Sequence, residues 1–371
     1  MKYLIINCVE TLVRFLPIPC KTGMIEIGHP DRNAPVFLTC NYHLTVERVK
    51  KVLEKMDCYL LVANSRGVNV WCAATGGLLT NHDIISVLKT SGIEDITDTR
   101  TVVLPQLAAT GIEKKVVEKK TGWNIVWGPA YAKDVPEFVE CEEKPPKMRE
   151  VTFTFLNRLE MAVAWAFPAS IIVGLVMTLF WQEKAVPSVI LVWMLSLVMN
   201  GVFPVRRSIL KRKILFLEVG RGGFQVVTWG AFMVILSVCT MVTGMKSDFV
   251  GWSIISAVVI LVLGFDLMGN TPVYKSGLHE DRLVTPVLDT SKCRGAGFCE
   301  DVCPRHCFTV DRKTHTALLE TDSCVRCGAC IVQCPFDAVH FENSKGEVIP
   351  PETIRKYKLN LMGSRLVKTG T

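Results

Sequence analysis

The chain has 371 residues, of which 49% are hydrophobic and only 21% charged, and its formal net charge is +7 at pH 7. This length predicts two or three domains, and the hydrophobic fraction excludes an ordinary soluble enzyme. The sequence contains no basic face interleaved with aromatic residues, so we expect no nucleic acid among its partners.

Residues 1–145 alternate short apolar runs with amphipathic ones. Strands are predicted at 35–40, 58–63, 67–71, 101–107 and 124–128, and helices at 45–56, 81–92 and 113–122. Strands that alternate with helices of this length predict an α/β sheet covered by helices. Glu10 interrupts the apolar N-terminal stretch and no small-residue cleavage site follows, so no signal peptide is predicted. The soluble parts are therefore expected in the cytoplasm, where thiols stay reduced.

A polar linker at 141–150 leads to four apolar spans, at about 162–181, 186–204, 224–245 and 249–268. Their lengths suit the ~30 Å hydrocarbon core of a lipid bilayer, so four transmembrane helices are predicted for residues 146–271. The alternative is a large buried helical core.

The loops between these spans predict their orientation. The loop Arg206–Lys213 holds five basic residues, and the positive-inside rule places it in the cytoplasm. Four spans then return both soluble domains to the cytoplasmic side of a multi-pass protein of the cytoplasmic membrane. Asp266 lies near a span end, where an interfacial or structural role is expected.

Residues 272–292 form a polar connector, residues 293–343 a cysteine domain, and residues 344–371 a basic tail. Eight of the 15 cysteines lie in the cysteine domain. One run reads C-x2-C-x2-C-x3-C-P, which is typical of two-cluster ferredoxins, and its fourth cysteine ligates the other cluster. An α+β ferredoxin-like fold with one [4Fe–4S] cluster is predicted, with a zinc site as the alternative. The expected ligands of this cluster are Cys324, Cys327, Cys330 and Cys303.

The upstream cysteine set has alanine, Ala296, at the second ligand position. The second cluster is left with Cys293, Cys299 and Cys334, which suits a [3Fe–4S] cluster or a [4Fe–4S] cluster with another fourth ligand. Cys307 is spare. It either lies near a cluster without ligating it, or serves as an extra ligand that binds a soft metal or substrate.

Another cysteine, Cys72, stands alone in "GVNVWCAATGG". Asn69 is predicted to cap a short helical turn, and Ala73 and Ala74 are expected to leave room above it. A thiolate there would be a nucleophile or a soft metal ligand. The alternative is a small buried thiol that packs like a hydrophobic residue.

"NVWCAATGG" resembles the cap-helix motif of the HgcA family, the corrinoid proteins of microbial mercury methylation. The segments "APVFLTCNYHLTVERVKKVLEKMDCYLLVANSRGVNVWCAA" and "TGWNIVWGPAYAKDVPEF" extend this resemblance over about residues 20–140. The cysteine domain resembles HgcB, the ferredoxin partner of that family, so the chain looks like a fusion of the two.

The resemblance implies a Rossmann-like corrinoid-binding domain in which Cys72 is the lower axial ligand of cobalt. The sequence contains no D-x-H-x-x-G motif, which agrees with cysteine ligation of cobalt, because the common histidine-ligated mode of corrinoid binding needs that motif. The family's cap helix corresponds to Asn69, Val70, Trp71, Ala73 and Ala74, and its pocket-lining positions correspond to Thr39, Asn41, Leu104, Pro105 and Gln106.

The implied activity is that of a corrinoid-dependent methyl carrier or methyltransferase whose ferredoxin domain reduces the cobalt. Its partners would be a methyl-donor methyltransferase and a low-potential electron donor, with Hg(II) as the acceptor. The sequence departs from the family at Thr75–Gly76, where Gly-Lys is usual, and in its tail, where the partner usually has a cysteine pair. Another methyl acceptor, or a membrane-anchored ferredoxin without a corrinoid, remains the alternative.

Overall fold

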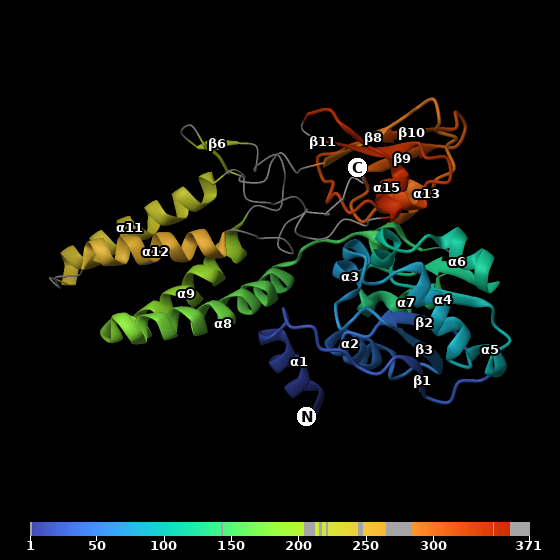
Figure 1. Cartoon of the computed structure of the whole chain (residues 1–371), viewed down its shortest axis with the longest axis horizontal. Helices are drawn as coiled ribbons and strands as arrows, with labels where there is room; N and C mark the ends of the chain where they lie inside the picture. Colours follow the sequence, from blue (N-terminus) through green and yellow to red (C-terminus); the bar gives the residue numbers. More distant parts are fainter. Residues whose placement is uncertain are drawn as a thin grey trace, which may run out of the picture. The chain divides into compact units, whose positions relative to one another are not determined.

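The computed structural model describes residues 2–141, 144–203, 212–214, 217–219, 222–243, 248–264, 284–343 and 345–356. These residues form two compact units. The first contains residues 2–7, Leu16–Val151 and the described residues from 284 onward, and the second contains Cys8–Phe15 with the described residues of Thr152–Glu280. An α/β domain and a ferredoxin-like domain make up the first unit (Figure 1).

The α/β domain has one five-stranded sheet with the order β1-β3-β2-β4-β5. Four of its strands are parallel, and β1 pairs antiparallel with β3 at the edge. The bounds are β1 Gly23–Ile27, β2 Val36–Cys40, β3 Cys58–Ala63, β4 Thr101–Leu104 and β5 Asn124–Trp127. β2 and β3 are buried along their whole length, as expected of parallel strands covered on both faces.

Helices cover both faces of this sheet, which confirms the predicted α/β class. Phe37 points into a core that it shares with α2 (His43–Leu53) and α7 (Val135–Glu140). Its neighbours Val36 and Leu38 point the other way, into the larger core. The elements on that side are α3 Val70–Gly76, α4 Asn81–Thr90, α5 Ile93–Ile96, the 3-10 helix η1 Gln106–Thr110 and α6 Lys114–Thr121.

Two predicted strands in this domain need correction. The strand at 67–71 is wrong, because Gly67 turns the chain with a φ of 72° and Asn69 then begins α3. The strand at 101–107 ends at Leu104, since Pro105 is the N-cap of η1, which begins at Gln106. The edge strand β1 and the N-terminal helix α1 (Lys2–Leu12) were not predicted. Short elements complete the domain and its linker: η2 Ala132–Asp134 and η3 Pro146–Arg149.

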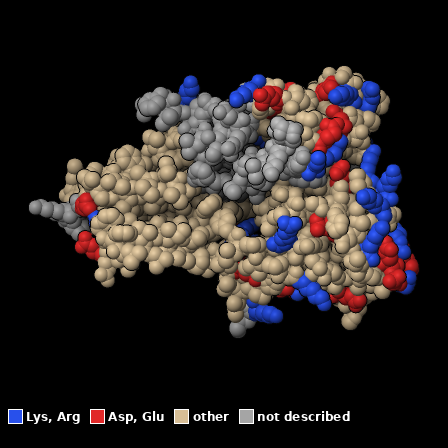
Figure 2. Space-filling model, viewed as in Figure 1, with Lys and Arg blue, Asp and Glu red and all other residues tan. Residues whose placement is uncertain are grey.

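The second unit contains four apolar helices, α8 Phe155–Phe180, α9 Gln182–Val202, α11 Gly223–Thr243 and α12 Phe249–Leu263. The first three are long and apolar enough to cross a membrane. Side chains such as Leu179 and Met241 are 78% and 82% exposed, and Figure 2 shows almost no charge over these helices. Apolar surface of this extent is typical of a protein that contacts lipid.

The fourth predicted span, 249–268, is described only as far as Gly264. Helix α12 has 15 residues, which at ~1.5 Å per residue is shorter than a hydrocarbon core. Asp266 and most of the basic loop Arg206–Lys213 lie outside the described residues. Two short strands, β6 Lys213–Ile214 and β7 Leu217–Glu218, pair in this region.

The ferredoxin-like domain has the predicted α+β content. β8 (Val284–Leu288), β11 (Val339–Asn343) and β12 (Val348–Ile349) form an antiparallel sheet, and β9 (Phe308–Asp311) and β10 (Thr316–Leu319) form a hairpin. Its helices are α13 Phe298–Val302, α14 Ala329–Gln333 and α15 Pro351–Lys356. Most of the predicted connector and of the basic tail lies outside the described residues.

Candidate functional site

The carboxyl ends of the parallel strands form the natural ligand-binding edge of the α/β domain. From β2 the chain passes through α2 to β3 on one side, and later returns to β4 on the other side of β2. This reversal makes the ends of β2 and β4 a topological switch point, where open α/β sheets bind their ligands. Asn41 follows β2, and Pro105 follows β4.

Asn41 positions the loop that leads to Cys72. Its Oδ1 accepts hydrogen bonds from Ser65 N at 2.8 Å, Ser65 Oγ at 3.0 Å and Gly67 N at 3.1 Å. Its Nδ2 donates to the carbonyl oxygen of Cys20 at 3.3 Å. The predicted pocket-lining residue is therefore buried and engaged with backbone, and it acts on the site by fixing the loop between β3 and α3.

Cys72 lies in the first turn of α3 and is held at two atoms by one side chain. Oδ1 of Asn69 accepts a hydrogen bond from Cys72 N at 3.0 Å, which is the predicted N-cap. Nδ2 of Asn69 donates to Cys72 Sγ at 3.2 Å. Cys72 is partly exposed, and its sulfur is oriented by the Asn69 side chain.

Helix α3 is seated on the domain through its small residues. Ala73 and Ala74 are fully buried, and a Cβ at Gly111 would stand 2.5 Å from the carbonyl oxygen of Ala74. Only glycine at 111 permits this close approach. The two alanines therefore face inward and allow tight packing, whereas we expected them to leave room above the turn. Trp71 and Cys72 are partly exposed, while Val70 is buried in the core.

The other predicted pocket residues differ in what they offer a ligand. Thr39 is buried at the end of β2, and its Oγ1 has no hydrogen-bond partner among the described residues. An orphaned hydroxyl at this edge suits a ligand with polar groups, such as a corrinoid with its amide side chains. Leu104 is a fully buried core residue, and Pro105 is the N-cap of η1.

Gln106 is buried and faces the ferredoxin-like domain. Its Nε2 donates to the carbonyl oxygen of Asp301 at 3.0 Å, and its Oε1 accepts from Lys144 Nζ at 2.7 Å. Lys144 also donates to the carbonyl oxygen of Trp127, at the end of β5, and lies 3.6 Å from Asp301 Oδ1. Burial lowers the pKa of Lys144 to about 8, although the Asp301 carboxylate opposes this shift.

Sequence reasoning missed Lys144, Ser65 and Gly111. Lys144 gave no signal, because a single lysine in a polar linker is ordinary. Ser65 and Gly111 are small residues after a predicted strand and a short helix, and their packing against Asn41 and Ala74 is a tertiary contact.

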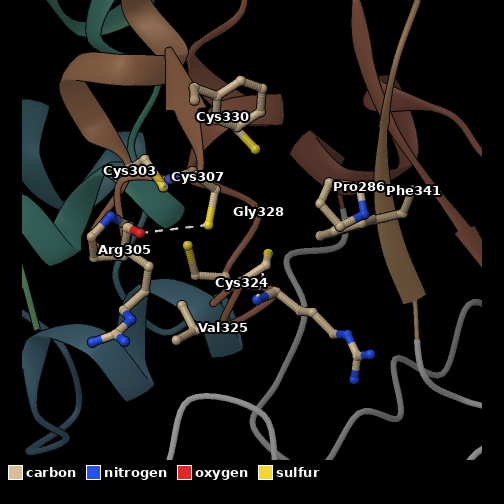
Figure 3. Close-up of a pocket in the computed structure, with 14 residues that line it drawn as sticks. Pro286, Cys303, Arg305, Cys307, Cys324, Val325, Gly328, Cys330 and Phe341 are labelled. Carbon is tan, nitrogen blue, oxygen red and sulfur yellow. Dashed lines mark hydrogen bonds between the residues drawn. The ribbon is translucent and has the colours of Figure 1, made fainter. Parts of the chain in front are cut away.

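Five cysteines surround one pocket in the ferredoxin-like domain (Figure 3). Four are the predicted [4Fe–4S] ligands, Cys303, Cys324, Cys327 and Cys330, and the fifth is Cys307. Among the described residues no three cysteine, histidine or acidic side chains converge on one metal ion. A cube differs from a single ion because each thiolate binds a different iron, so this donor set fits a cluster better than zinc.

The remaining predicted ligands also lie near one another. The charges of Cys334 and Cys293 help to raise the pKa of Cys299, which burial raises to about 12. Thiols must lose their protons to bind a metal, so cluster binding at this place would release protons.

The backbone of one cysteine segment repeats that of the other. Gly297 and Gly328 have φ values of 80° and 78°, and Cys303 and Cys334 share a φ of −72°. The backbone next to residue 296 therefore matches the backbone next to residue 327, but residue 296 is alanine whereas residue 327 is cysteine.

Cys307 occupies the place that Ala338 holds in the other repeat. Cys307 N donates to Cys303 Sγ at 3.2 Å, as Ala338 N donates to Cys334 Sγ at 3.4 Å. The Cys307 thiol donates to the carbonyl oxygen of Arg305 at 3.8 Å (Figure 3), and its interaction with Cys303 raises the pKa of Cys307 and lowers that of Cys303 to about 6. This geometry supports a residue that contacts a cluster ligand through hydrogen bonds.

Comparison with known proteins relates the two ends of the chain to different families. Residues 8–139 match the model of the CO dehydrogenase/acetyl-CoA synthase delta subunit, and residues 292–338 match the 4Fe-4S dicluster domain. The subunit gamma of the acetyl-CoA decarbonylase/synthase complex from Methanopyrus kandleri is 37% identical over 138 residues, or 37% of this chain and 29% of that protein. The same subunit from Methanocaldococcus jannaschii is 34% identical over 135 residues, or 36% of this chain and 27% of that protein.

The chain thus spans less than a third of the length of these relatives. The matches support the coarser part of the sequence prediction, a corrinoid iron–sulfur protein type with a two-cluster ferredoxin domain. They lend no support to the mercury-methylation family in particular.

Proposed function

We propose that the α/β domain binds a corrinoid at the carboxyl edge of its sheet, and that the chain carries methyl groups with it. Cys72 would be the protein ligand of the cobalt, and the ferredoxin-like domain would supply electrons. When bound, the corrinoid supplies a cobalt centre that accepts a methyl group from a donor and passes it to an acceptor.

The observation that carries this proposal is the geometry of Cys72. The residue is partly exposed and its sulfur accepts a hydrogen bond from Asn69 Nδ2, while the same side chain caps the backbone of Cys72. Cys40 and Cys58 of the same domain are buried, whereas Cys20 and Cys141 are also partly exposed, so the hydrogen bond to the Cys72 sulfur carries more weight than its exposure. The orphaned hydroxyl of Thr39 gives the edge a second feature that a polar ligand would satisfy.

Each of these residues would contribute a separate function. Asn69 would orient the sulfur and stabilise its anionic form by donating a hydrogen bond, since such bonds to ionised groups are strong. Gly111 would keep α3 packed closely on the rest of the domain, so that the position of the Cys72 sulfur relative to the sheet is fixed. The cysteines of the ferredoxin-like domain would hold a [4Fe–4S] cluster and a second [3Fe–4S] or [4Fe–4S] cluster.

The methyl acceptor is proposed from chemistry alone. A sulfur ligand donates electron density to cobalt, which favours transfer of the methyl group to a soft electrophile such as Hg(II). The donor would be a separate methyltransferase. The curated relatives are subunits of an acetyl-CoA decarbonylase/synthase complex. A partner protein that joins the methyl group to a carbonyl group is therefore the second acceptor to test.

We also propose that the apolar helices anchor the chain in the cytoplasmic membrane. Helices α8, α9 and α11 have the required length and composition. A fourth crossing, at about 249–268, would place both soluble domains on the cytoplasmic side.

The test is to purify the full chain anaerobically in detergent with corrinoid supplied, and to measure cobalt per chain for the wild type and for Cys72→Ala. We expect close to one cobalt per wild-type chain and a visible spectrum that changes in the variant. Hg(II) and carbonyl acceptors can then be compared directly. A wild-type protein that holds iron and sulfide but no cobalt would contradict the proposal and leave a membrane-anchored ferredoxin.

A further inference from the structure

The ferredoxin-like domain shares a hydrophobic core with the α/β domain inside the first unit. Val302 of α13 and Ala329 of α14 are each 2% exposed and belong to the larger core of the α/β domain. Helix α14 contacts η1, the 3-10 helix that follows β4. Burial of this extent indicates a defined docking surface.

Two glutamine amides, one from each domain, form hydrogen bonds across this surface. Gln333 Nε2 donates to the carbonyl oxygens of Ala109 at 2.8 Å and Ile112 at 2.6 Å, and its Oε1 accepts from Lys114 N at 3.4 Å. In the reverse direction, Gln106 of η1 donates to the carbonyl oxygen of Asp301 in α13. Both amides are buried, so each lost bond would leave a carbonyl without its partner.

The same 3-10 helix touches the helix that carries Cys72. Helix α3 contacts η1, and Ala74 packs directly on Gly111 at the end of η1. Cys327 also packs against this core, whereas the matching position in the other repeat, Ala296, has no sulfur. The cluster with Cys327 is thus the one whose ligand reaches the core on which α3 rests.

We propose that the cluster held by Cys303, Cys324, Cys327 and Cys330 is the electron exit of the ferredoxin-like domain, and that Gln333 and Gln106 form the clamp that docks it. The proposal rests on the proposed function, because its acceptor is the cobalt of the corrinoid. With both groups bound, the reduced cluster would supply one electron to the corrinoid, and no group would be transferred in this step. The other cluster would receive electrons from a low-potential external donor. Electron tunnelling slows exponentially with distance, so loss of docking would slow this transfer.

The clamp is tested by amide hydrogen exchange in the full chain, with Gln333→Glu as the variant. Glutamate keeps the volume and an acceptor for Lys114 N, but it cannot donate to the two carbonyl oxygens and adds a repelling charge. Exchange of the amides at 106–114 should accelerate on the order of tenfold. Glu352→Gln changes the charge of an exposed side chain of α15 and is the matched control. Unchanged exchange in Gln333→Glu, with iron and sulfide intact, would overturn the clamp.

The exit is tested by electron paramagnetic resonance of the reduced clusters, with bound corrinoid in its paramagnetic cobalt(II) state. The signal that Cys299→Ala removes belongs to the three-cysteine cluster. We expect the signal of the other cluster to need several-fold more microwave power for saturation when the cobalt(II) corrinoid is bound than when it is absent. The Gln333→Glu substitution should reduce this difference. A larger effect on the three-cysteine cluster would overturn the exit assignment. If the wild type binds no cobalt, the proposed function and the exit assignment both fail, while hydrogen exchange still decides the clamp.

Discussion

Asn69 holds Cys72 with two separate atoms, so two substitutions can separate their effects. Asn69→Ala removes the cap to Cys72 N and the hydrogen bond to Cys72 Sγ. Loss of an N-cap costs about 0.5–2 kcal/mol. Asn69→Asp keeps an oxygen for the cap but puts a carboxylate where the sulfur now meets a donor.

The stability of α3 and the affinity for corrinoid should therefore respond differently. A loss of about 1 kcal/mol corresponds to roughly fivefold faster exchange of the α3 amides in Asn69→Ala. In Asn69→Asp we expect wild-type exchange, because the cap is kept. Both variants should bind corrinoid more weakly and alter its visible spectrum, since neither can donate to the sulfur.

Amide exchange of the corrinoid-free chain and cobalt titration of the supplied chain measure these two quantities separately. Our reasoning about the cap would be refuted by Asn69→Asp loosening α3 as much as Asn69→Ala does. Wild-type cobalt affinity in both variants would show that the hydrogen bond to Cys72 Sγ has no part in ligation.

Three further substitutions test other parts of the site. Thr39→Val should leave the corrinoid-free chain as stable as the wild type, since it removes an unpaired buried hydroxyl, and should lower cobalt content. Gly111→Ala should displace α3 at a cost of about 1–3 kcal/mol, so that cobalt is lost while iron content is unchanged. Because the pKa of Lys144 falls from 10.5 to about 8 on folding, the unfolded chain binds more protons between these pH values. Stability from this group therefore rises with pH across that window, and Lys144→Met should remove this rise from the melting temperature.

Features with a local signal were predicted from the sequence. The helix at 81–92 is observed as α4, because Thr80 forms a capping box with Asp83. The strand at 58–63 is observed residue for residue as β3. Asn69 was identified as a cap because its residue type and its place before a small-residue helix are both local properties.

Features that depend on contacts distant in sequence were not predicted. The strand expected at 67–71 failed because Gly67 packs against Pro19, and a Cβ there would stand 2.6 Å from Pro19 N. Gln106 was predicted to line the ligand pocket, but its hydrogen bond to the carbonyl oxygen of Asp301, far along the chain, was not foreseen. No pattern in one sequence reveals that pairing, because docking of two domains depends on their surfaces in three dimensions.

The two repeated cysteine segments share one backbone conformation but place their cysteines differently. Left-handed residues recur at matching places, such as Gly295 and Arg326, so the turn that wraps a cluster exists in both halves. The halves differ at 296, which is alanine where 327 is cysteine, and at 307, which is cysteine where 338 is alanine, so each half has four cysteines at different places. One backbone therefore accommodates two different sets of cluster ligands without any change of fold. Ala296→Cys should supply a fourth thiolate to the cluster of Cys293, Cys299 and Cys334.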